Sequence, residues 1–207
     1  IRGYFDADEV LMIAIDPDIK EFDGSDAKFG FVFNDMPRAE FDQGAVLRKD
    51  YLKRLGRDAL KYQAASITEQ VMLSFTTDPY PPAHHELTRW TLKTLQAHGL
   101  AICTLTKGGK RALRDIELFR RDRDAFAVTL TSLDSSFSKK WERNAAPPAE
   151  RIASLHQFRK AGIFTWVSLE PTLDVDAIME IVRVTSPFVD LYKIGRANYL
   201  KEITRTT

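Results

Sequence analysis

The chain contains very little cysteine: Cys103 is the only one among 207 residues. A single thiol excludes an intramolecular disulfide, and it excludes a metal site built from several cysteines of this chain. A chain without disulfides fits a reducing compartment, so we expect a cytoplasmic protein. The sequence also lacks the run of about 18 apolar residues that a membrane-spanning helix needs, and its first residues do not resemble a signal peptide. We therefore expect no membrane partner.

The chain also lacks an excess of charge of either sign. Thirty basic residues oppose 29 acidic ones, which gives a formal net charge of +1. Affinity for nucleic acid would therefore have to come from local basic patches. Apolar residues make up 44% of the sequence, which is ordinary for a globular protein. We expect a single domain over residues 1–207, with 70–199 the best supported part and 1–69 an irregular N-terminal part.

Short apolar runs alternate with amphipathic stretches from Gln70 onward. Such runs predict strands, and apolar residues that repeat every three or four positions predict helices. The expected strands cover residues 71–75, 101–105, 125–130, 163–169 and 188–194, and the expected helices cover 83–98, 111–121, 149–161 and 175–184. Further strands are expected at 11–15 and 29–33, and one or two helices within 45–64.

Local signals support the helix boundaries. Val175, Ile178 and Met179 have helical spacing, and Asp174 is placed to cap the first turn. Gly99 and Gly162 each follow a predicted helix, where a left-handed closing residue is needed. Repeated strand–helix–strand units with apolar strands predict an α/β fold with a parallel sheet. The spacing leaves open whether this sheet is doubly wound or forms a full or partial barrel.

Polar side chains follow every predicted strand from residue 71 onward. In parallel α/β folds the reactive groups gather at these C-terminal strand ends. A small zwitterionic ligand with a ribose suits such an edge, because it needs a cation, a carboxylate and hydroxyl partners. The candidate binding residues are Thr76, Thr77, Asp78, Lys107, Thr131, Ser132, Glu170, Lys193 and Asn198.

Six segments in the same order resemble the spore photoproduct lyase-like (DNA repair photolyase-like) group of the radical S-adenosylmethionine superfamily. The first is the run 76–81 (TTDPYP) with the following 86–89 (ELTR). The others are 104–107 (TLTK) with 113–115 (LRD), 145–152 (AAPPAERI), 161–163 (AGI), 167–171 (VSLEP) and 189–195 (VDLYKIG). The resemblance covers about residues 70 to 199.

The resemblance implies a partial (β/α)6 TIM-like barrel with S-adenosylmethionine bound at its strand ends. It implies a lyase-type enzyme in which a 4Fe–4S cluster and an external electron donor cleave this cofactor to a 5′-deoxyadenosyl radical. By the same resemblance, Thr76 to Asp78 hold the methionine amino group and Lys107 faces its carboxylate. Thr131 or Ser132 supplies a hydroxyl, and Glu170, Lys193 and Asn198 lie on the same rim. The named member of this group repairs DNA, so the resemblance implies a nucleic-acid substrate.

One departure from the family pattern is large. The family holds its cluster with three cysteines spaced C-x3-C-x2-C, whose thiolates bind three of the four irons. Cys103 lies inside a predicted strand and cannot replace them. Either the segment that carries these cysteines is missing from the chain, or this protein has lost the radical chemistry.

Two other functions therefore stay open: a cluster-free barrel that binds a nucleotide or S-adenosylmethionine without catalysis, and a TIM-like hydrolase that uses Asp78 and Glu170 as acid and base. We expect Cys103, Trp90 and Trp166 to be core residues. For Trp141 the sequence does not decide between a core residue and a base-stacking surface. The nearby Lys139, Lys140 and Arg143 are compatible with contacts to a phosphate backbone.

Overall fold

The computed structural model describes residues 11–12, 50–73, 78–82, 86–142 and 144–195. The described strands are β1 (Leu11–Met12), β2 (Gln70–Leu73), β3 (Ala101–Thr106), β4 (Ala125–Thr129), β5 (Phe164–Ser168) and β6 (Leu191–Lys193). The helices are α2 (Tyr51–Ala64), α3 (Glu86–Ala97), α4 (Ser135–Trp141), α5 (Pro148–Lys160) and α6 (Val175–Thr185), with a 3-10 helix η1 at Gly109–Leu118. The strand expected at 29–33 and most of the one expected at 11–15 lie outside the described residues.

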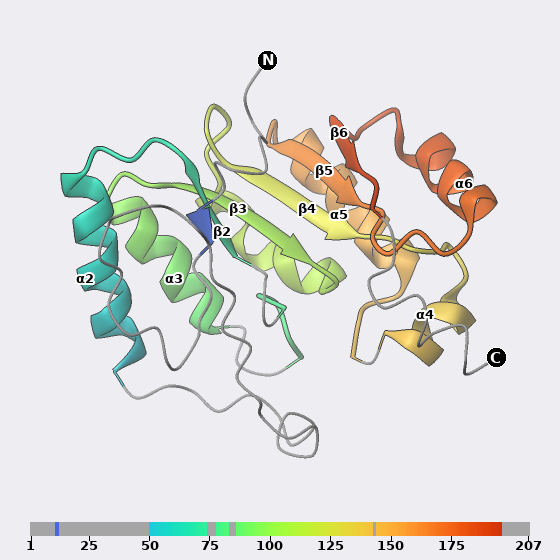
Figure 1. The fold of residues 1–207 in the computed structure, drawn as a ribbon, viewed down its shortest axis with the longest axis horizontal. Helices are drawn as coiled ribbons and strands as arrows, with labels where there is room; N and C mark the ends of the chain where they lie inside the picture. The colour runs from blue at the N-terminus through green and yellow to red at the C-terminus, as the bar shows by residue number, and fades with distance from the viewer. Residues whose placement is uncertain (1–10, 13–49, 74–77, 83–85, 143, 196–207) are drawn as a thin grey trace.

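The strands form one six-stranded sheet in the order β1-β2-β3-β4-β5-β6, and every neighbouring pair is parallel. Each strand therefore lies beside the one that precedes it in the chain, and helical segments make the crossovers (Figure 1). This arrangement confirms the α/β class and the parallel, partial TIM-like barrel. It also brings all the strand ends with polar residues to the same edge of the sheet.

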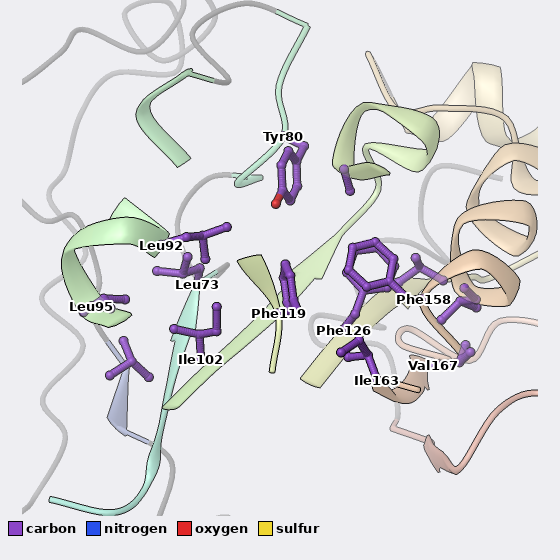
Figure 2. Packing of buried hydrophobic residues seen from close by; sticks show 14 of the residues in the cluster. Leu73, Tyr80, Leu92, Leu95, Ile102, Phe119, Phe126, Phe158, Ile163 and Val167 are labelled. Carbon is purple, nitrogen blue, oxygen red and sulfur yellow. The ribbon is translucent and has the colours of Figure 1, made fainter. Parts of the chain in front are cut away.

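The two faces of the sheet carry different residues, because side chains alternate along each strand. One face packs against the helices and forms the main core, which includes Ile102, Phe126 and Val167 from strands and Leu155 and Phe158 from α5. The rings of Phe126 and Phe158 stack with centroids 3.7 Å apart, and Phe119 meets Phe158 edge-on at 4.9 Å (Figure 2). The other face carries a smaller buried cluster made only of strand residues: Met72, Cys103, Ala125, Ala127 and Trp166.

The signals at helix ends are confirmed. The Asp174 side chain accepts hydrogen bonds from the backbone N–H groups of Asp176 and Ala177 and so caps α6. Gly99 and Gly162 close their helices with φ of 74° and 83°, in the left-handed region that favours glycine.

The structure differs from the sequence-based prediction at several elements. The helix expected at 111–121 is a 3-10 helix over Gly109–Leu118, and the backbone becomes extended at Phe119, which turns its ring into the core. The short helix α4 was not predicted, although Asp134 caps it by accepting from the backbone N–H of Ser136.

One expectation about apolar side chains was wrong, and the spacing on α6 did not settle which side chains are buried. Trp166 is buried as expected, but Trp90 is 54% exposed on α3. On α6 the buried residues are Ile178, Ile181 and Thr185, whereas Val175 and Met179 face outward. The periodicity of α6 is compatible with both stripes, and the packing against the sheet selects one of them.

Candidate functional site

Three polar residues lie in register at the C-terminal ends of neighbouring strands. Thr129 of β4 pairs with Ser168 of β5, and Ser168 pairs with Lys193 of β6. They continue the alternation that places Ala127 and Trp166, two residues earlier, on the face without helices. Thr129 and Ser168 are buried, and Lys193 is half-buried. We call Thr129, Ser168 and Lys193 the polar row.

The floor beneath the polar row is apolar. Trp166 is 1% exposed, and its indole N–H donates to the sulfur of Cys103 at 3.4 Å. The Lys193 ammonium lies 5.0 Å from the centroid of the Trp166 ring, within the range of a cation–π contact. Small residues, Ala125 and Ala127, cover the same face on β4. The row thus separates an apolar floor from the polar edge, as in sites that bind a ligand with apolar and charged parts.

Lys107 follows β3 directly and brings a second cation to this edge. Its ammonium lies 3.1 Å from Oε1 of Glu142, and its side chain is 37% exposed. The contact is an ion pair, since Glu142 Oε1 accepts no hydrogen bond within the part of the chain that the structure describes. Lys107 is therefore held in place and can still donate to a ligand.

A fully buried arginine fixes the residues around Lys107. Arg151, on α5, donates to the carbonyl oxygens of Ala146 and Thr129, at 2.7 and 2.9 Å. It also donates to Ser138 Oγ at 2.8 Å and to Glu142 Oε2 at 2.5 Å. These bonds tie α4 and α5 to the end of β4. The polar edge is therefore held by charge-assisted hydrogen bonds rather than by loop packing alone.

The electrostatics of Glu142 follow from this position. Burial by itself would raise the pKa of its carboxyl group, but the hydrogen bond from Arg151, the charge of Lys107 and the hydroxyl of Ser138 outweigh burial and lower it. Glu142 therefore stays ionised, and the Lys107–Glu142–Arg151 group carries one net positive charge.

Asp78 lies at the start of the described loop after β2 and shapes the backbone of the edge. Its Oδ1 accepts from the Tyr80 N–H at 2.8 Å and from the Thr106 hydroxyl at 2.5 Å. Its Oδ2 accepts from the backbone N–H of Lys107 at 2.5 Å. The carboxylate is thus occupied by three donors of the protein itself, and it positions Lys107. Its expected contact with a ligand ammonium stays a prediction.

Glu170 lies beyond the end of β5, exposed at the same edge. Its Oε2 accepts from the Ser168 hydroxyl at 3.3 Å, and its carboxylate rests against Gly195 so closely that a side chain at this glycine would collide with it. The backbone joins the two segments as well, because Thr172 donates to the Gly195 carbonyl at 3.0 Å. The Glu170 carboxylate thus lies against the segment that follows β6.

The remaining predicted residues are placed as follows. Thr131 is buried just beyond β4, and Ser132 accepts from the Asp134 N–H and lines an acidic hollow with Asp174 and Glu180. Thr76, Thr77 and Asn198 lie outside the described residues. Sequence reasoning missed Thr129, Ser168, Glu142 and Arg151. The first two could have been found by counting back two positions from Thr131 and Glu170 along the strand alternation.

The residues of this chain do not fit a 4Fe–4S cluster. Cys103 is 1% exposed and bonded to Trp166, and burial raises the pKa of its thiol to about 12. A cluster needs thiolates, and this thiol stays protonated. Within the described ranges no group of three or more His, Cys, Asp or Glu side chains could hold a metal ion. In the same ranges no helix is long and apolar enough to cross a membrane.

Comparison with known proteins gives the fold. No protein-family model and no curated protein matches the chain. A crystal structure of Streptococcus suis SuiB bound to S-adenosylmethionine matches with a TM-score of 0.57 and 12% identity, over 78% of this chain and 40% of the SuiB chain. A second SuiB structure matches with a TM-score of 0.52 and 13% identity, over 72% of this chain and 34% of SuiB. The likeness shows that this chain shares its fold with part of SuiB, and the chain spans less than half of the SuiB chain.

Proposed function

We propose that this chain is the cofactor-binding core of a radical S-adenosylmethionine enzyme and binds that cofactor at the C-terminal ends of its strands. The observation that carries the proposal is the edge formed by Lys107, Glu170 and the polar row, in a fold shared with a protein crystallised with S-adenosylmethionine. The likeness of six segments to the spore photoproduct lyase-like group supports the same assignment.

The residues of the edge match the parts of this ligand. Lys107 would face the methionine carboxylate with the donors that Glu142 leaves available. Glu170 would accept hydrogen bonds from the ribose hydroxyls, and the Thr129 and Ser168 hydroxyls lie between the two cations. The apolar floor around Trp166 would take the adenine ring. Roles for Thr76, Thr77 and Asn198 rest on the family resemblance.

The finer function follows from the same resemblance. In that group a 4Fe–4S cluster, reduced by an external donor, supplies the electron that cleaves S-adenosylmethionine. Because the residues of this chain do not fit the cluster, we derive no step through it. We propose a lyase-type reaction on a nucleic-acid substrate, in a cytoplasmic protein.

A cluster-free S-adenosylmethionine-binding barrel is the second candidate. One observation favours it: the single cysteine is buried in β3 with a protonated thiol. The hydrolase alternative is disfavoured, because three donors of the protein occupy the Asp78 carboxylate and hold it away from the role of a free base.

The test is calorimetric titration of the chain with S-adenosylmethionine. We expect K107M to weaken binding about tenfold or more, since it removes the cation that pairs with the carboxylate. Lys160, exposed at the far end of α5, gives the matched control K160M, which should leave the affinity unchanged. Equal affinities of wild type and K107M would refute the assigned site. Release of 5′-deoxyadenosine by the product of the complete open reading frame, after anaerobic reconstitution, would separate the enzyme from the cluster-free barrel.

A further inference from the structure

The short helix α4 presents an aromatic pair beside the candidate site, made of the exposed Trp141 and the half-buried Phe137. Trp141 is 63% exposed, and the ring of Phe137, one helical turn earlier, lies 6.4 Å from it at 43°. Residues four positions apart share a helix face, so both rings lie on one side of α4. The exposed tryptophan with a second, tilted ring beside it forms an apolar surface larger than a single scattered side chain.

Cations surround this aromatic pair. The Lys140 ammonium lies 5.0 Å from the centroid of the Trp141 ring, and both Lys139 and Lys140 are exposed. The acidic residue that follows Trp141 does not offset them, because Arg151 and Lys107 already pair with the Glu142 carboxylate. The C-terminal end of α4 is therefore aromatic and positively charged.

Hydrogen bonds connect the helix that carries the aromatic pair to the edge of the sheet. Ser138, in the middle of α4, is 4% exposed and bonds both Arg151 and Glu142. Glu142 in turn lies 3.1 Å from the Lys107 ammonium. In Figure 1, α4 lies on the side of the sheet toward which the strand arrows point. A ligand bound on Trp141 would thus lie next to the proposed cofactor site.

The two ends of α4 differ in charge. Its N-terminal end borders the acidic hollow, whose lining includes Asp134, Asp174, Asp176 and Glu180. Phosphates would be repelled there and attracted at the opposite end of the helix. A polyanion should therefore cross α4 at Lys139, Lys140 and Trp141.

We propose that the C-terminal end of α4 binds single-stranded nucleic acid, with a base stacked on Trp141 and the backbone phosphates near Lys139 and Lys140. Stacking platforms with flanking cations are how proteins bind single strands without reading their sequence. This inference rests on the nucleic-acid substrate of the proposed function, but the docking itself needs no cofactor.

The test measures fluorescence anisotropy of a labelled oligothymidylate of about 12 nucleotides in the absence of S-adenosylmethionine. We expect W141A to weaken binding about tenfold or more, and W141F to retain most of the affinity, because a phenyl ring can still stack. The matched control is W90A. Trp90 is 54% exposed and has Lys93 5.7 Å from its ring, but it lies on α3, away from the edge. W90A should bind like the wild type.

The salt dependence tests the phosphate contacts. Each lost contact to a single strand makes the slope of log K against log salt less negative by about 0.7, so K139Q/K140Q should make it less negative by about 1.4. A parallel titration with an oligouridylate of the same length shows whether the surface prefers RNA or DNA.

Several outcomes would overturn the inference: no binding at physiological salt, equal loss in W141A and W90A, or duplex binding that does not depend on Trp141. Titration of W141A with S-adenosylmethionine separates this inference from the proposed function. Loss of oligonucleotide binding with cofactor binding intact supports the docking surface. If oligonucleotide binding depends on Trp141 but the wild-type chain binds no S-adenosylmethionine, the proposed function is refuted and the docking surface stands.

Discussion

The Glu142 carboxylate lies between two cations, with Oε1 3.1 Å from the Lys107 ammonium and Oε2 2.5 Å from the Arg151 guanidinium. Lys107 follows β3, Glu142 follows α4, and Arg151 belongs to α5. One carboxylate thus connects three segments at the edge where the candidate site lies. The stability of the edge and its capacity to bind an anion therefore depend on the same group.

Replacement of Arg151 by methionine should destabilise the protein strongly. Its side chain is fully buried, and the change removes the donor of two carbonyl oxygens and leaves Glu142, among the described residues, with only Ser138 and Lys107 as partners. Removal of one partner of a buried ion pair costs about 3–5 kcal/mol. Urea unfolding of R151M measures this loss. The matched control is R183M, because Arg183 pairs with Glu180 on the surface of α6 and such pairs contribute about 0–1 kcal/mol. A loss in R151M no larger than in R183M would contradict the network.

Stability should depend on pH through Glu142. Its pKa in the folded protein is lowered, so its contribution to the free energy of unfolding is full above the unfolded pKa of about 4.3. That contribution is lost as pH falls from there through the folded pKa. The difference in unfolding free energy between wild type and E142Q should therefore be large at neutral pH and shrink below about pH 4. A difference that stays constant between these pH values would rule out an ionised, paired carboxylate.

Much of this fold follows from local pattern. The strands from β2 to β6 overlap the predicted runs, because strands covered on both faces must be apolar throughout. The helix α4 escaped prediction since its seven residues carry two lysines and three serines, and tertiary bonds from Arg151 hold them. The polar edge could be placed at the strand ends from sequence. The role of Glu142 could not, because its partners lie in other segments and only the packed chain brings them together.

Gly108 and Gly56 should respond in opposite ways to alanine. A Cβ at Gly108 would lie 2.6 Å from the Tyr80 Cβ and 2.8 Å from the Thr106 hydroxyl, so overpacking should cost about 1–3 kcal/mol. A Cβ at Gly56, inside α2, meets no atom within 4 Å, and the change should stabilise the helix by about 0.5–1 kcal/mol. Thermal unfolding of G108A and G56A measures both. Stabilisation by G108A would show that the loop after β3 is not packed as described.

Cys103 should resist thiol reagents in the folded protein. It is 1% exposed, and its pKa is raised to about 12 chiefly by burial. The thiolate is the reactive species, so at pH 8 we expect modification by a disulfide reagent about a hundredfold slower than in urea. Absorbance of the released thiol gives both rates. Equal rates would show that β3 is open to solvent at this position.

The sequential strand order has a consequence for biosynthesis. Each strand pairs with the strand made just before it, so every new strand–helix unit emerging from the ribosome meets a partner that already exists. From β2 to β6 no strand has to wait for a later one, and each closure spans a single crossover; only β1 and β2, among the described strands, are joined across a long stretch of chain. The sheet can therefore assemble during translation, with the lysine-bearing edge completed only when Lys193 is added.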